Sequence, residues 1–278
     1  MLRYFKPGCI CNMQDEHCQK SNTSDEFALN ILRGIFHCNN SRLLQSLEMW
    51  QVLKSRGFDG SPHNPMWKKY FPECHGEQKG CREKFANQCS DSKARVSKVP
   101  RISLNLAAQL LKTEPNLKII HLLRDPRAIM LSRDAFKWTP APEGSLSLCK
   151  KMKEDYLESD IIKKTHPERI LTVFYEDLVQ HPKESVQEMY DFAGFEFDER
   201  AVNHLRRMTQ IKTKSISPGT TYRNTSAQFA MSWRTKINRT ILELMEPGCR
   251  DVYKLLGYPS LKTEADLHNS DIPLRILN

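Results

Sequence analysis

The fold is decided by the stretch Ile119-Ile120-His121-Leu122-Leu123, which leads directly into Arg124-Asp125-Pro126-Arg127. A short apolar run that ends in a charged cluster is typical of a buried strand in a parallel sheet. Asp125 is a good helix N-cap, and Pro126 fits the first helical position, where its missing N–H costs nothing. We therefore predict a strand over 118–123 and a helix that begins near residue 126.

This corner between strand and helix has the features of an anion site. The first N–H groups of a helix are free, and its dipole places positive charge at that end. Arg124 and Arg127 lie at the turn, and Ser132 and Arg133 follow two turns later. A phosphate is the natural ligand. The alternative is that the arginines are solvated surface charges or partners of a nearby carboxylate, and local features alone do not decide between these readings.

The remaining pattern predicts one α/β domain over 1–278, in which helices cover a parallel sheet. Helical spacing occupies 24–57, 104–111, 146–164 and 182–192, the last closed by Gly194, and a second strand occupies 170–174. We expect a cysteine-rich loop region over 58–94, a short strand over 96–99, a mobile loop over 137–147 and a C-terminal tail over 259–278. No apolar stretch reaches the ~20 residues that cross a bilayer.

The net charge of the chain restricts the possible classes of binding partner only in part. The chain carries 42 lysines and arginines against 33 acidic residues, a formal net charge of +9, and the basic residues are spread along the chain. Such a balance favours polyanionic partners: nucleic acid, an acidic lipid surface, a nucleotide or an acidic glycan. No nucleic-acid-binding motif accompanies it, so we expect no nucleic-acid partner.

The nine cysteines indicate an oxidising compartment. No Cys-x-x-Cys pair occurs, and the spacing of Cys74-His75 with Cys81 and Cys89 matches no common zinc site, so we expect disulfides and no metal. Cys149 and Cys249 lie outside the N-terminal cluster of cysteines and are the first pair to test. Four Asn-x-Ser/Thr sequons agree with a glycoprotein of the secretory pathway.

The corner also resembles a known motif. Leu123-Arg124-Asp125-Pro126-Arg127-Ala128, with Ser132-Arg133, is similar to the 3'-phosphate-binding motif of Golgi carbohydrate sulfotransferases, which sulfate N-acetylglucosamine, galactose or N-acetylgalactosamine. In that family the arginine and the serine eight residues later bind the 3'-phosphate of 3'-phosphoadenylyl sulfate. The resemblance therefore implies a P-loop-like sulfotransferase fold and donor contacts from Arg124, Arg127 and Ser132.

Further matches follow in the family's order over 118–258. They are Leu148-Cys149 with the charged run after it, Phe174-Tyr175-Glu176-Asp177-Leu178 with Pro182, Arg223-Asn224-Thr225-Ser226 with Trp233-Arg234, and Cys249 through Leu256-Gly257-Tyr258. By resemblance, Tyr175 contacts the adenine or its ribose, although a core tyrosine is the other reading. Arg223 is a plausible second clamp on the 3'-phosphate. Trp233 either stacks nearby or anchors the last helices. We expect Glu176 and Asp177 to be solvated or capping residues without an acid–base role.

The implied activity is metal-free transfer of a sulfuryl group from 3'-phosphoadenylyl sulfate to a sugar hydroxyl, the 6-O position, of a glycan or glycosaminoglycan in the Golgi lumen. No glycine-rich 5'-phosphosulfate loop precedes residue 118, and no N-terminal membrane anchor is present. We therefore expect either a truncated chain or a relative that binds nucleotide or acidic glycan without turnover. The catalytic residues stay unassigned.

Overall fold

The structure is a computed structural model, and it describes residues 3–6, 9–12, 18–20, 24–39, 87–99, 102–135, 143–210 and 230–276. Its contacts divide the chain into two compact units, Met1–Thr113 and Glu114–Asn278. Each unit is described by itself below.

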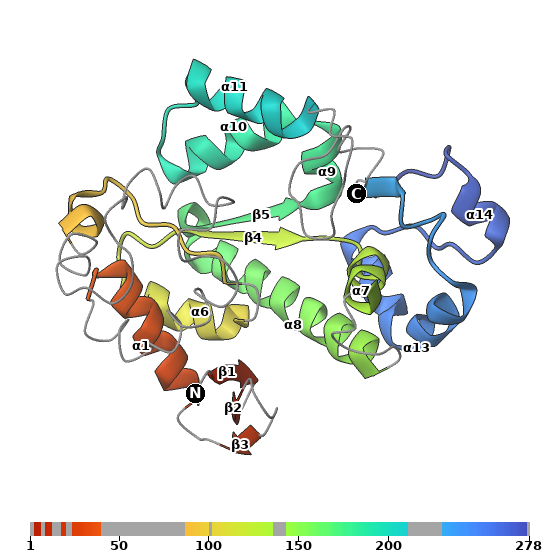
Figure 1. Cartoon of the computed structure of the whole chain (residues 1–278), viewed down its shortest axis with the longest axis horizontal. Coiled ribbons are helices and arrows are strands. Elements are labelled where there is room, and N and C mark those ends of the chain that lie inside the picture. The colour runs from red at the N-terminus through yellow and green to blue at the C-terminus, as the bar shows by residue number, and fades with distance from the viewer. Residues whose placement is uncertain are drawn as a thin grey trace, which may run out of the picture. The chain divides into compact units, whose positions relative to one another are not determined.

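The unit Glu114–Asn278 is built on two parallel strands, β4 (Ile119–Leu123) and β5 (Ile170–Phe174). Between them the chain forms α7 (Pro126–Ala135), α8 (Glu143–Thr165) and a 3-10 turn, Pro167–Arg169. After β5 come α9 (Tyr175–Gln180), α10 (Pro182–Ala193), α11 (Glu199–Gln210), α13 (Arg239–Leu256) and α14 (Glu264–His268). Figure 1 shows α8 on one side of the strand pair and α10 with α11 on the other. The α/β class, both strands and the start of α7 are confirmed.

The core of this unit lies between α7, α8 and α13. Met130 from α7, Met152 from α8 and Val252 from α13 are buried together with Leu123 at the end of β4. A disulfide between Cys149 and Cys249 ties α8 to α13, with both cysteines fully buried. The pairing predicted from the sequence is confirmed.

Two helices of this unit end on a glycine with positive φ. Gly194 closes α10 at φ 79°, as the sequence predicts, and Gly257 closes α13 at φ 77°. In both, the backbone N–H of the glycine donates back into the last turn. Only glycine adopts this left-handed conformation without a steric cost.

The unit Met1–Thr113 contains an antiparallel sheet of β1 (Arg3–Lys6), β2 (Cys9–Asn12) and β3 (Cys18–Lys20). It also contains α1 (Ser24–Phe36) and α6 (Leu104–Leu111), which pack together. A disulfide joins Cys38 to Cys89, and this bond removes Cys89 from the zinc alternative.

Several sequence predictions for loops need correction or lie outside the described residues. The strand over 96–99 is wrong, because this segment has no regular structure and Val96 is 90% exposed, whereas a strand needs a paired neighbour. α8 begins at Glu143, so 143–147 is helical rather than part of a mobile loop. Residues 87–91, within the predicted loop region 58–94, are helical. Residues 40–57, 58–86 and 136–142 lie outside the described residues.

Candidate functional site: the carboxyl edge of β4 and β5

The register of the two strands brings Arg124 and Tyr175 together. Leu123 pairs with Phe174, so the next residue of each strand leaves the sheet at the same edge. The guanidinium carbon of Arg124 lies 4.6 Å from the centre of the Tyr175 ring, within the range of a cation–π contact. Arg124 Nε is buried and has no hydrogen-bond partner among the described residues. A buried cationic donor without an acceptor favours an anionic ligand at this edge.

The start of α7 is capped by its own sequence. The Asp125 carboxylate accepts a hydrogen bond from the backbone N–H of Arg127 at 2.9 Å, and the Asp125 carbonyl accepts from Ile129 N–H at 3.1 Å. Asp125 is therefore the N-cap, as predicted. Ser132 lies further along α7 and is exposed.

Arg127 lies in the protein interior, with only 2% of its surface exposed. Its Nε and Nη2 donate to both oxygens of Asp125, at 3.0 and 2.7 Å, and its Nη1 donates to the Pro259 carbonyl at 3.0 Å. The guanidinium is also held between the rings of Trp233 and Tyr253, 4.9 and 4.5 Å away. Burial opposes its charge, but the Asp125 carboxylate outweighs burial and raises the pKa of Arg127. These contacts occupy the groups that would otherwise bind a ligand.

Glu176 is the residue whose environment the sequence did not predict. It is 3% exposed, so the first of the two alternatives, a solvated side chain, is wrong. Its Oε1 accepts from the backbone N–H of Asp125 at 2.9 Å, and its Oε2 accepts from the Tyr258 hydroxyl at 3.1 Å. Burial raises the pKa of Glu176, and the hydrogen bond from Asp125 offsets part of that shift. Glu176 thus connects the end of β5 to the start of α7 and to the residues after α13.

The C-terminal residues of the chain pack beside this edge of the sheet. Arg234 is 2% exposed and donates to the carbonyls of Ile272 and Pro273, both at 2.7 Å. Burial is the main cause that lowers the pKa of Arg234, and repulsion from Arg127 is the second. Arg275 forms an ion pair with Asp177 at 2.6 Å and lies 3.8 Å from the centre of the Phe174 ring. Asp177 is therefore a partner in an ion pair and not simply solvated.

The predicted site residues that the structure describes thus fall into three groups. Arg124 and Tyr175 are in contact, Ser132 is exposed on the adjoining helix, and Arg127 is buried beneath the corner. Arg223 lies outside the described residues. Trp233 is buried and anchors Arg127. Glu176, Tyr258 and Arg275 were missed as structural partners of the site, because only the folded chain brings residues 176, 258 and 275 together.

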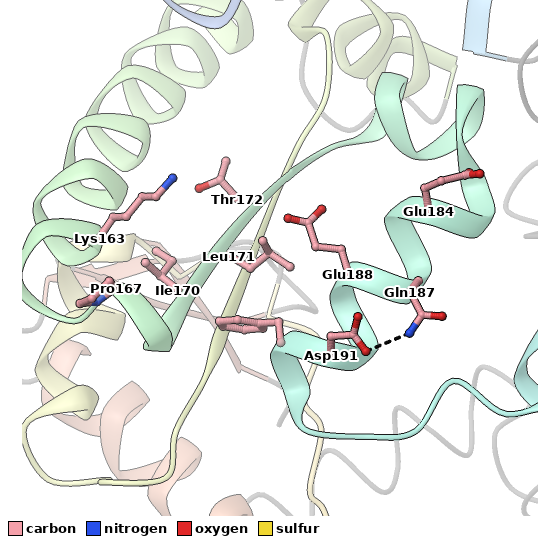
Figure 2. A pocket seen from close by; sticks show the side chains of 10 residues that line it. Lys163, Pro167, Ile170, Leu171, Thr172, Glu184, Gln187, Glu188 and Asp191 are labelled. Carbon is pink, nitrogen blue, oxygen red and sulfur yellow. Dashed lines mark hydrogen bonds between the residues drawn. The ribbon is translucent and has the colours of Figure 1, made fainter.

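A pocket of about 700 Å³ lies near the opposite end of β5. Figure 2 shows Lys163 on one side of β5 and Glu188 and Asp191 of α10 on the other, with a hydrogen bond of 2.9 Å from Gln187 to Asp191. Ile170, the first residue of β5, also lines it. This pocket is separate from the edge where Arg124 and Tyr175 lie.

Among the described residues, no group of His, Cys, Asp and Glu side chains could hold a metal ion. Within the same ranges, no helix combines the length and apolar character that a membrane span requires.

Comparison with known proteins assigns the class. A family model described as a sulfotransferase domain matches residues 23–244, and the chain therefore belongs to the sulfotransferase family. Its relatives include carbohydrate sulfotransferases, which confirms the resemblance in the sequence.

Carbohydrate sulfotransferase 3 of Mus musculus is 28% identical over 76% of this chain and 49% of its own length. Carbohydrate sulfotransferase 1 of Danio rerio is 28% identical over 64% of this chain and 46% of its own. The chain thus spans about half the length of these curated relatives. The crystal structure of mouse sulfotransferase SULT7A1 complexed with PAP matches with a TM-score of 0.38 and 18% identity, covering 63% of this chain and 73% of that one, which is too low for any argument from it.

Proposed function

We propose that this protein takes part in sulfuryl transfer from 3'-phosphoadenylyl sulfate to a sugar hydroxyl, the 6-O position, of a glycan or glycosaminoglycan. The family and the carbohydrate sulfotransferase relatives support the reaction class. The observation that carries the donor site is Arg124, whose buried Nε lacks a partner while its guanidinium lies over Tyr175.

Each residue of the corner has a role in this proposal. Arg124 binds the 3'-phosphate of the donor, because a guanidinium offers paired N–H donors to phosphate oxygens. Ser132 and Arg223 add a hydroxyl and a second guanidinium to the same group. Tyr175 contacts the adenine or its ribose while it orients Arg124. Arg127 holds the corner in shape through Asp125 and does not touch the donor. No metal takes part.

We also propose that the protein works in the Golgi lumen. Within the described residues, the disulfides Cys38–Cys89 and Cys149–Cys249 suit an oxidising compartment.

The test is calorimetric titration with the product nucleotide, adenosine 3',5'-bisphosphate. Arg124→Gln is expected to weaken its binding by about 10- to 100-fold, the effect of losing a charged hydrogen bond worth roughly 1.5–3 kcal/mol. Arg250→Gln removes an exposed arginine of α13 and serves as the control. Equal binding by the two variants would overturn the site.

Incubation with labelled donor and a panel of acceptor sugars then tests turnover, and analysis of the product gives the hydroxyl position. If the chain binds the nucleotide without transferring sulfate to any acceptor, it is the non-catalytic relative that binds nucleotide or acidic glycan without turnover.

A further inference from the structure

The helix α11 presents one strongly basic face to solvent. The exposed side chains recur at helical spacing and cover a single side: Glu199, Arg200, Asn203, His204, Arg206 and Arg207. The half-buried side is mainly apolar and includes Val202, Leu205 and Met208. α11 packs on α10, and Tyr190 and Phe197 are in contact beside the turn that joins the two helices.

The positive charge of this face is concentrated towards its C-terminal half. Arg200 is paired with Asp198 at 2.7 Å, next to the acidic start of the helix. Among the described residues, neither Arg206 nor Arg207 forms an ion pair. Two guanidinium groups are therefore available to an external anion, with the His204 imidazole beside them.

The sequence extends this charge beyond the helix. Between residues 200 and 242 the chain has nine lysines and arginines and no aspartate or glutamate, while the whole chain has a net charge of +9. Although basic residues occur throughout the chain, the surplus comes from this stretch. A stretch without compensating acids attracts polyanions over a distance.

The direction of α11 in the fold also brings its basic end towards the carboxyl ends of β4 and β5. In Figure 1 it runs the same way as β4 and β5, so its C-terminal end points towards the side of the unit that holds the carboxyl ends of the strands. The interval from Arg200 to Arg207 is about 10 Å along the helix axis, enough to meet more than one charge of a polymer.

We infer that the exposed face of α11 binds an acidic polysaccharide, a chain with repeated sulfate or carboxylate groups, and holds it near the edge where Arg124 and Tyr175 lie. This inference rests on the proposed function, which supplies a glycan as the substrate. Apart from the His204 ring, the face has no aromatic side chain on which nucleic-acid bases could stack, and it has no apolar side chain that could enter a membrane. Its donors are guanidinium, imidazole and amide groups, which suit sulfates, carboxylates and hydroxyls.

The experiment compares two double variants on immobilised heparin, used as a highly sulfated polysaccharide. Arg206→Gln with Arg207→Gln removes two positive charges near the end of α11. Lys163→Gln with Lys164→Gln removes two exposed charges from the last turn of α8 and is the matched control. Glutamine is a good helix former, so both helices are kept, and circular dichroism verifies this.

The α11 variant is expected to elute at lower NaCl and to bind heparin about tenfold more weakly near 0.15 M salt. The reason is that a chain with two fewer arginine contacts displaces fewer counterions from heparin when it binds. The α8 variant should bind within twofold of the original chain. The inference is overturned if both variants elute together, or if double-stranded DNA displaces the original chain from heparin as readily as free heparin does.

Binding of adenosine 3',5'-bisphosphate to the same variants separates this inference from the proposed function. The α11 variant should retain nucleotide affinity, because its arginines do not belong to the donor corner. If the unaltered chain fails to bind the nucleotide, the proposed function fails, whereas the difference on heparin still decides whether α11 binds an acidic polysaccharide.

Discussion

Arg124 and Arg127 lie three residues apart on one corner, but their surroundings give them different functions. Arg127 has a carboxylate, a carbonyl and two aromatic rings as partners, so its charge is used within the fold. Arg124 has the Tyr175 ring and a buried Nε without an acceptor. The difference follows from Asp125, which turns its carboxylate towards Arg127 and leaves Arg124 Nε without an acceptor among the described residues.

At the same scale, Glu176 makes stability depend on pH. Because its pKa is raised in the folded protein, the folded state binds a proton more tightly than the unfolded chain does. Its favourable contribution is complete below the ordinary value of 4.5 and is lost as pH rises through the folded-state pKa. Glu176→Gln keeps an acceptor for Asp125 N–H and removes the titration. The free energy of unfolding of the original chain should therefore fall relative to Glu176→Gln as pH increases from about 4.5.

Urea denaturation at a series of pH values, followed by hydrogen exchange in peptides of α8 and α13, measures this difference. Glu184→Gln on the exposed face of α10 is the control and should show no such trend. A difference between the original chain and Glu176→Gln that does not change with pH would show that Glu176 does not titrate in this range.

At the scale of elements, the glycines that end α10 and α13 differ in the room that they leave for a side chain. Both adopt positive φ, so alanine at either position costs about 1–2 kcal/mol of backbone strain. A Cβ on Gly194 would meet nothing within 4 Å, whereas a Cβ on Gly257 would collide with the Ile276 carbonyl oxygen. Gly257→Ala should therefore lower the free energy of unfolding more than Gly194→Ala does, by about 2 kcal/mol or more. Chemical denaturation of both variants measures it, and equal losses would contradict the clash.

The helices and strands also show which features of the fold could be predicted from the sequence. The strand 119–123, the cap at Asp125 and the end at Gly194 depend on neighbouring residues, and local patterns predicted them. The environment of Glu176 depends on Tyr258, which is 82 residues away. No local pattern carries that pairing, so a glutamate after a strand was predicted to be solvated or capping. The same reason explains why the contacts of Arg127 with Pro259 and Tyr253 were not predicted.

At the scale of the whole Glu114–Asn278 unit, the C-terminal segment supports the corner between β4 and α7. Pro259 accepts a hydrogen bond from Arg127, and Ile272 and Pro273 accept from Arg234. The N–H of Ile276 donates to the Gly257 carbonyl at 2.7 Å, and Leu274 is buried against Val179 and Ala230. The end of the chain is thus part of the fold that positions Arg124 and Tyr175.

Arg275 tests this support, because the chain offers a second arginine–aspartate pair for comparison. Arg275 pairs with Asp177 and covers the Phe174 ring, and its side chain is 14% exposed, whereas Arg200 in the pair with Asp198 is 93% exposed. An exposed ion pair contributes little, and a partly buried one that also covers a ring contributes more. Arg275→Gln should lower the free energy of unfolding by about 1–2 kcal/mol, and Arg200→Gln should cause no measurable change.

Arg275→Gln should also weaken binding of adenosine 3',5'-bisphosphate severalfold, since Phe174 directly precedes Tyr175. If Arg275→Gln and Arg200→Gln behave alike in denaturation and titration, the C-terminal segment does not support the site.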